Sequence, residues 1–140
     1  MTNVKCKIYE FNCNIYPRKI WICFNPSREA LDEMFGKGVV CDMDDTMDAC
    51  VQNVIRRSDN KWGELIRFKS KSCPPGHIAH EASHAAMDIL GQLDVDFDGY
   101  HQEALAYLIG WVTDCIHNCI KGKLPEDVKI HEYPLQNEKL

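Results

Sequence analysis

The chain has 140 residues, with 16 Lys and Arg against 21 Asp and Glu, and a formal net charge of −5 at pH 7. This length fits one domain, and the negative charge argues against nucleic acid or an anionic membrane surface as the main partner. With 45% hydrophobic and 26% charged residues, the composition is that of an ordinary globular domain and excludes a disordered, collagen-like or coiled-coil chain.

The amino-terminal residues alternate between polar and apolar types and lack the unbroken apolar stretch of a secretory signal. No apolar run reaches the roughly 18 residues that a membrane span needs. We therefore expect a cytoplasmic protein that makes no membrane contact. The eight cysteines are too few for a disulfide scaffold, so we expect most of them to be buried thiols.

Four segments of the chain have the composition of strands. They alternate in polarity or are rich in β-branched and aromatic residues. These segments are 4–11, 15–25, 49–57 and 63–69. Pro17 indicates a turn or an edge position near the first two, and the polar turn between the last two predicts a β-hairpin.

Three segments predict helices. A short helix begins at residues 25–27 and ends at Gly36, because Asn-Pro-Ser is a helix start and glycine a helix stop. Residues 77–90 are Ala-rich and contain no internal Gly or Pro, and residues 100–121 carry apolar residues at helical spacing. An acidic loop, residues 91–99, joins these two long helices.

Together these segments predict an α+β fold in a single domain, residues 1–140. A mainly antiparallel, twisted sheet packs on the helix at 77–90, and the second long helix, 100–121, lies antiparallel to the first. Residues 122–140 contain two prolines and few apolar residues, and we expect them to form a C-terminal arm.

The clearest chemical signal is the sequence His80-Glu81-Ala82-Ser83-His84 inside the first long helix. Residues four apart lie one turn apart on one helix face, so both imidazoles can reach one zinc ion at about 2.0 to 2.1 Å. Glu81 lies about 100° further around the helix, where it is placed to take a proton from a metal-bound water instead of binding the metal.

A catalytic zinc needs a third protein ligand and an open position for water. Glu103 is our candidate for this ligand and stands nineteen residues after His84. If the two long helices pack antiparallel, a rise of about 1.5 Å per residue places Glu103 and His84 roughly level. Ala85 and Ala86 are small enough to let the helix axes approach closely.

The HExxH sequence together with Glu103 resembles the zincin metallopeptidases of the gluzincin type, in which the third ligand is a Glu on a following helix. Residues 78–86 and 103–111 resemble more closely a group of small phage- and prophage-encoded metallopeptidase-like proteins of unassigned substrate. The resemblance, which runs loosely over 16–116, implies one zinc ion on the two histidines and Glu103, with Glu81 as base and then acid. It also implies a peptide or protein substrate and, for a phage-encoded protein, the host-cell cytoplasm.

The chain departs from the larger gluzincins near the third ligand. Tyr107 stands one turn beyond Glu103, where thermolysin-like members carry an Asp. We also expect no separate downstream domain to supply an oxyanion donor. The group that stabilises the transition state is therefore unassigned, and Tyr107, His101 and His77 are the candidates for this catalytic role.

Residues 39–46 suggest a rival chemistry. They match the opening of haloacid-dehalogenase-type phosphotransferases, in which the first Asp, here Asp42, is the nucleophile beside a magnesium ion. That fold needs a parallel sheet, whereas a hairpin and two helices are predicted after Thr46. The alternative is an acidic surface loop.

Asp94, Asp96 and Asp98 copy the first acidic positions of an EF-hand loop. Position 12 should be a bidentate Glu, but it is Leu105, so the cage for Ca²⁺ or Mg²⁺ is incomplete. We favour a solvated turn before the second long helix over a weak cation site.

Cys115, His117 and Cys119 lie close together on the second long helix. Two cysteines one turn apart do not make a structural zinc site, so buried thiols are the preferred interpretation.

The sequence thus predicts a zinc-dependent hydrolase of the peptidase type. The alternative is a metal-stabilised binding or adaptor module without turnover, which would hold a protein partner through a sheet edge at residues 65–69. The phosphotransferase is the least favoured of the three. Substrate preference and oligomeric state stay open.

Overall fold

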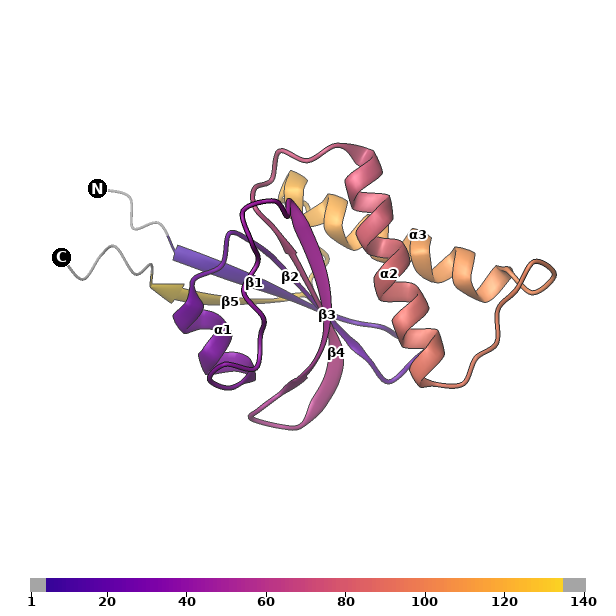
Figure 1. Ribbon diagram of the computed structural model, residues 1–140, viewed down its shortest axis with the longest axis horizontal. Helices are drawn as coiled ribbons and strands as arrows, with labels where there is room; N and C mark the ends of the chain where they lie inside the picture. The colour runs from indigo at the N-terminus through magenta and orange to yellow at the C-terminus, as the bar shows by residue number, and fades with distance from the viewer. Residues whose placement is uncertain (1–4, 135–140) are drawn as a thin grey trace.

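The computed structural model describes residues 5–134 as an α+β arrangement of five strands and three helices. In chain order the elements are β1 (Lys5–Asn12), β2 (Lys19–Phe24), α1 (Arg28–Phe35), β3 (Ala49–Arg56), β4 (Lys61–Phe68), α2 (Pro75–Gln92), α3 (Glu103–Lys121) and β5 (Lys129–Pro134). Figure 1 shows the short α1 at one end of the sheet and the two long helices at the other. The α+β class is confirmed.

The five strands form one mixed sheet in the order β3-β4-β2-β1-β5. Three of the four pairings are antiparallel, and β2 pairs with β4 in parallel. The parallel contact is close at Gly63, where an added Cβ would lie 2.2 Å from the backbone oxygen of Lys19 and 2.7 Å from the ring of Trp21. Only glycine allows this approach of the two strands.

The two faces of the sheet are covered by different helices. One hydrophobic core contains the buried faces of α2 and α3 with side chains such as Ile22, Ile66 and Phe68. The other core packs α1 against alternate residues of the same strands, among them Trp21 and Leu65. The alternation follows from the two-residue period of a strand, which sends neighbouring side chains to opposite faces.

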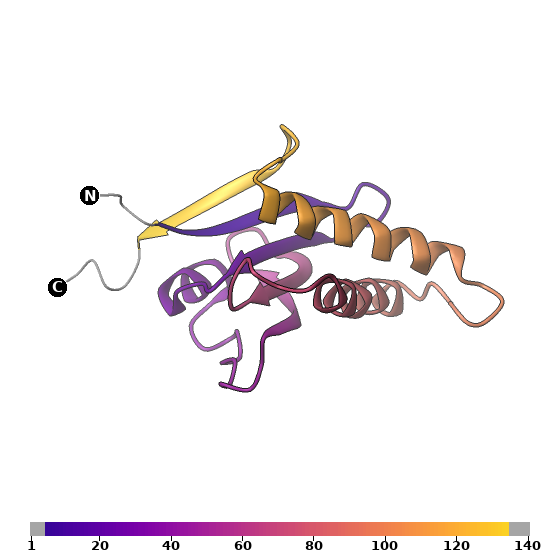
Figure 2. The ribbon, with the colours of Figure 1, turned by 90° about the horizontal axis from the view of Figure 1, so that it is seen from above.

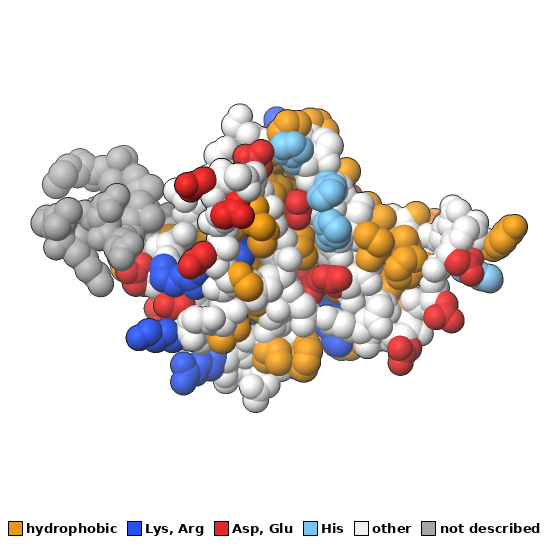
Figure 3. All heavy atoms as spheres, in the orientation of Figure 1, with side chains coloured by type: hydrophobic (Ala, Val, Ile, Leu, Met, Phe, Trp, Pro, Cys, Tyr) orange, Lys and Arg blue, Asp and Glu red, His pale blue; other side chains and the backbone are white. Residues whose placement is uncertain are grey.

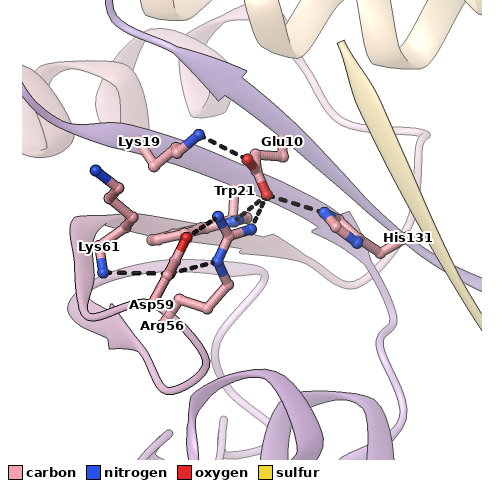
Figure 4. A network of polar contacts seen from close by, with 7 residues as sticks. All are labelled: Glu10, Lys19, Trp21, Arg56, Asp59, Lys61 and His131. Carbon is pink, nitrogen blue, oxygen red and sulfur yellow. Dashed lines mark hydrogen bonds and ion pairs between the residues drawn. The ribbon is translucent and has the colours of Figure 1, made fainter.

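A buried ionic network ties four of the strands together on the α1 side (Figure 4). Glu10 of β1 is 2% exposed and accepts hydrogen bonds from Lys19 Nζ at 2.8 Å, Trp21 Nε1 at 3.2 Å and His131 Nε2 at 2.9 Å, and it also pairs with Arg56. Burial alone would raise the pKa of Glu10, but the hydrogen bonds from Lys19 and His131 and the charge of Arg56 lower it to about 2. The carboxylate is therefore ionised and holds β2, β3 and β5 to β1.

The predicted C-terminal arm is partly a strand. Residues 129–134 form β5, which pairs antiparallel with β1 along its full length and becomes an edge of the sheet. This strand was not predicted because residues 122–140 are mostly polar, and an edge strand needs little apolar surface. Residues 135–140 of the arm and residues 1–4 of the first predicted strand lie outside the described residues.

Two further element boundaries differ from the prediction. The second strand begins at Lys19 and not at residue 15, because the segment around Pro17 forms the turn between β1 and β2. The last helix begins at Glu103, three residues later than predicted. The carboxylate of Asp98 accepts hydrogen bonds from the backbone N–H groups of Tyr100 and His101 and so holds these residues in a turn.

The two long helices pack on each other and run in broadly opposite directions, but they cross obliquely instead of lying side by side. In Figures 1 and 2 the end of α3 that follows the loop extends beyond α2. Within residues 5–134, no helix combines the length and apolar character that crossing a bilayer requires.

Candidate metal centre

The helix that carries the HExxH sequence is amphipathic and begins at Pro75, whose fixed φ and missing N–H suit a first helical position. Its apolar face packs on β3, β4 and α3. The buried apolar residues of this face are Ile78, Ala82, Ala85, Ala86, Ile89 and Leu90. His77, His80 and His84 lie on the opposite, exposed face, where Figure 3 shows a row of histidines on the surface turned toward the viewer.

The two histidines of the HExxH sequence converge. His80 Nε2 and His84 Nε2 are 3.1 Å apart, with the ring planes at 75° and the ring centroids 4.7 Å apart. If both nitrogens bound one metal ion with bonds of about 2.1 Å, this separation would give an N–metal–N angle of about 95°. A tetrahedral angle would need the two nitrogens to be about 3.4 Å apart. The helix thus holds two imidazole nitrogens close to the spacing that a zinc ion requires.

Glu81 lies on the flank of α2 that faces the sheet. It is 8% exposed and is one of four charged side chains buried in the described part of the chain. Asp88, two turns further along the same flank, interacts with Glu64 of β4. Glu81 therefore lies on the side of α2 between the exposed histidine face and the β3–β4 half of the sheet.

Glu64, which was predicted only as part of a strand, is fully buried beneath α2. Its Oε2 accepts a hydrogen bond of 2.7 Å from Asn53 Nδ2 on β3, while its Oε1 has no partner among the described residues. Burial, together with the neighbouring Asp88 carboxylate, raises the pKa of Glu64 to about 9. Glu64 is therefore neutral at pH 7 and links β4 to the flank of α2 that carries Glu81.

Glu103 is not brought to the histidine pair. It is the first residue of α3, is exposed, and lines a shallow depression together with Tyr107, Trp111 and Asp114. Across residues 5–134, no three His, Cys, Asp or Glu side chains gather closely enough to hold one metal ion. The prediction that Glu103 and His84 lie level assumed that the two helices lie side by side. Instead α2 and α3 cross obliquely, and Glu103 is at the end of α3 that extends beyond α2 (Figure 1).

The three candidates for transition-state stabilisation lie in different places. Tyr107 is 75% exposed and lines two cavities with Trp111, and neither cavity includes a histidine of α2. His101 lies in the loop before α3, where its Nδ1 is 3.0 Å from an Asp98 oxygen. His77 is exposed one turn before His80 and, of the three, alone shares the histidine face of α2.

The phosphotransferase motif lies in an irregular loop. Residues 41–48 contain no strand, so Asp42 does not follow the apolar strand that this chemistry needs. Asp42 instead pairs with Arg28 of α1, and Asp44 accepts hydrogen bonds from the backbone N–H and the hydroxyl of Thr46. The acidic surface loop is the interpretation that this geometry fits.

The acidic loop before α3 has its three aspartates exposed. Asp94 adopts a positive φ of 55°, and Asp98 is occupied by the turn that precedes α3. This arrangement fits the solvated turn that we favoured from the sequence.

All eight cysteines are free thiols. Four of them are buried, among them Cys115 and Cys119 of α3, and burial raises the pKa of the Cys119 thiol to about 12. Cys41 is exposed and the other three are half-buried, so half of the cysteines, and not most, are buried thiols.

The edge proposed for partner binding is wrong. Residues 65–68 belong to β4, which is paired on both sides, with β3 and with β2. The free edges of the described sheet are β3 and β5, and β3 is the edge against which α2 packs.

Comparison of the chain with protein-family models, with curated proteins and with solved structures finds no match.

Proposed function

We propose that the chain is a zinc-dependent hydrolase of peptide bonds with a zincin-like site on α2. The observation that carries the proposal is the convergence of His80 Nε2 and His84 Nε2 to 3.1 Å on an exposed helix face, with Glu81 adjacent. Exposed imidazoles that present two nitrogens at this spacing fit a borderline-soft divalent ion such as zinc.

Each residue has a separate task in this proposal. His80 and His84 bind as neutral imidazoles through Nε2. A bound zinc ion supplies Lewis acidity, which lowers the pKa of water toward about 7 and polarises a peptide carbonyl. Glu81 takes the proton from the attacking water and delivers it to the nitrogen of the leaving amine. The assignment is supported by the position of Glu81 on α2, next to His80 in sequence and on the flank adjoining the histidine face.

We further propose that Glu103 is the third ligand and that metal binding draws the first turn of α3 toward α2. The buried side chains of α3 begin at Leu108, and before it only the partly buried Leu105 packs against the core, so the turn that carries Glu103 has little anchorage. Its N-cap residue, Gln102, makes no capping hydrogen bond with its side chain. A segment held this weakly moves at low energetic cost.

The substrate in this proposal is an extended peptide that adds to the outer edge of β3. Within the described chain β3 pairs only with β4, so its other edge offers unpaired backbone groups. Because α2 packs on β3 and Glu81 faces that half of the sheet, a peptide on this edge passes beside Glu81.

The substitution Glu81→Gln tests the proposal. We expect the zinc-loaded protein to cleave a denatured proteome, and we expect Glu81→Gln to abolish cleavage while keeping about one equivalent of zinc. A chelator should stop the wild-type reaction, and zinc but not magnesium should restore it. Ser83→Ala, at a variable position of the same motif, is the matched control and should cleave normally.

Two results would contradict these roles. Cleavage by Glu81→Gln at the wild-type rate would remove Glu81 as the base, and loss of its zinc would make Glu81 a ligand. Zinc binding without any cleavage by the wild-type protein would favour the adaptor module over the hydrolase.

A further inference from the structure

Arg67 of β4 is a buried cation without a buried anion. It is 3% exposed, and within residues 5–134 no carboxylate forms an ion pair with it. Its Nη1 donates to the backbone oxygen of Cys41 at 2.7 Å and its Nη2 to Cys50 Sγ at 3.2 Å, while its Nε has no partner in the described structure. Buried charges in proteins are normally paired, because an isolated one is costly to desolvate.

Arg67 lines a cavity of about 300 Å³. This cavity lies where α1 begins and β4 ends, and the loop at 42–43 also lines it. Its charged lining residues are Arg28, Asp42, Arg67 and Lys69. Because Arg67 alternates with Phe68 along β4, the cavity is on the α1 side of the sheet, and the histidines of α2 are on the other.

The charges around this cavity leave an excess of cations. Three cationic side chains line it, and Asp42, the one acidic side chain in the lining, is paired with Arg28. Lys69 Nζ donates to the backbone oxygen of Asp45 at 2.7 Å, and its charge helps to lower the pKa of Asp44 outside the cavity lining. Arg67 forms no ion pair with a carboxylate among the described residues. The amino-terminal end of α1, which adds a partial positive charge, begins beside Pro26.

We propose that this cavity binds an oxyanion, carried by a small ligand as a phosphate ester or a carboxylate. Arginine suits this ligand because its N–H groups form charge-assisted hydrogen bonds with oxyanion geometry, and Arg67 supplies at the cavity wall a positive charge that no carboxylate pairs with. Lys69 at the exposed rim adds a second charge. The site shares no residue with the HExxH centre, so it stands independently of the hydrolase proposal.

Inorganic phosphate and acetate, each compared with chloride at equal ionic strength, are the probes for this site. We expect phosphate, acetate or both to raise the Tm of the wild-type protein saturably, because a ligand that binds only the folded state stabilises it. The probe with the larger effect identifies the source of the oxyanion. Arg67→Met should weaken this binding at least about tenfold, whereas Arg57→Met, at an exposed arginine outside the cavity, should leave it unchanged.

Lys69→Met keeps the test decisive if Arg67→Met fails to fold. Lys69 is exposed, so its replacement should preserve the fold and still weaken phosphate or acetate binding by about threefold or more. The proposal is overturned if neither probe raises the Tm beyond chloride, or if Arg67→Met or Lys69→Met responds as the wild type does. His84→Ala should keep the full response, which separates a failure here from a failure at the metal centre.

Discussion

The proposed metal ligands lie on two helices, α2 and α3, and the parts of these helices that carry the ligands differ in how firmly they pack on the rest of the protein. The middle of α2 brings His80 and His84 to 3.1 Å through its own geometry, on a helix fixed against the sheet by a full apolar face. Glu103 lies in the first turn of α3, before the buried residues of that helix, and α3 crosses α2 obliquely. A spacing within one helix is set locally, whereas a spacing between two helices depends on how both pack.

The largest expected effect is on the zinc affinity of His80 and His84, whose spacing is set within one helix. Replacing His84 with Ala removes one of the two converging nitrogens, and we expect zinc affinity to fall more than about 100-fold. Competitive titration against a chromogenic zinc chelator measures the change. His117→Ala, at an exposed histidine of α3, should bind zinc normally, and equal affinities for the two variants would show that the pair is not the site.

The next effect, again on zinc affinity, concerns Glu103, the proposed ligand on α3. If metal binding draws the first turn of α3 to the pair, Glu103→Gln should weaken zinc binding by about 10- to 100-fold. The same titration tests it, with Asp114→Asn as the control because Asp114 lines the same depression on the same helix. If Glu103→Gln binds as tightly as the control, Glu103 stays where the structure places it and the third ligand is another group.

The smallest expected effect is on the pH dependence of the free energy of unfolding, and it concerns Glu64, which links β4 to α2. Because the pKa of Glu64 is raised to about 9, the folded chain keeps a proton that the unfolded chain releases above about pH 4.5. The associated stability is fully present below pH 4.5 and is lost as the pH rises toward 9, with a slope of at most about 1.4 kcal/mol per pH unit. Glu64→Gln cannot titrate, so its free energy of unfolding should fall less steeply over this range.

Urea unfolding between pH 5 and pH 8 measures these slopes. Glu126→Gln, at an exposed glutamate, should follow the wild type. Parallel curves for the wild type and Glu64→Gln would mean that Glu64 is ionised in the folded protein, and the neutral link between β4 and α2 would then be wrong.

Local patterns predicted most of the elements because their causes are local. Alternation marked the hairpin of β3 and β4, and helical spacing marked α2 and α3 to within three residues at each end. The strand β5 was missed because its pairing with β1 joins segments more than a hundred residues apart, through a polar sequence that shows no core face. The parallel pairing of β2 with β4 was missed for a similar reason, since α1, a long loop and β3 separate the two strands in the chain.

The candidate site, like the fold, could be predicted from the sequence only where its geometry is local. The spacing of His80 and His84 is readable from five residues, whereas the place of Glu103 depends on a helix crossing that no short pattern encodes. Glu64 and Arg67 were treated only as parts of a predicted strand. Their chemistry depends on Asp88 and Asn53 in one case and on Cys41 in the other, which are distant in sequence and close only after folding.

X-ray absorption at the zinc edge of the protein loaded with one equivalent of zinc tests the central claim most directly. The proposed site predicts two imidazole nitrogens and additional light ligands at about 2.0 to 2.1 Å, and one imidazole fewer in His84→Ala. Sulfur scattering at about 2.3 Å, or an unchanged number of imidazoles in His84→Ala, would place the zinc elsewhere and contradict the account.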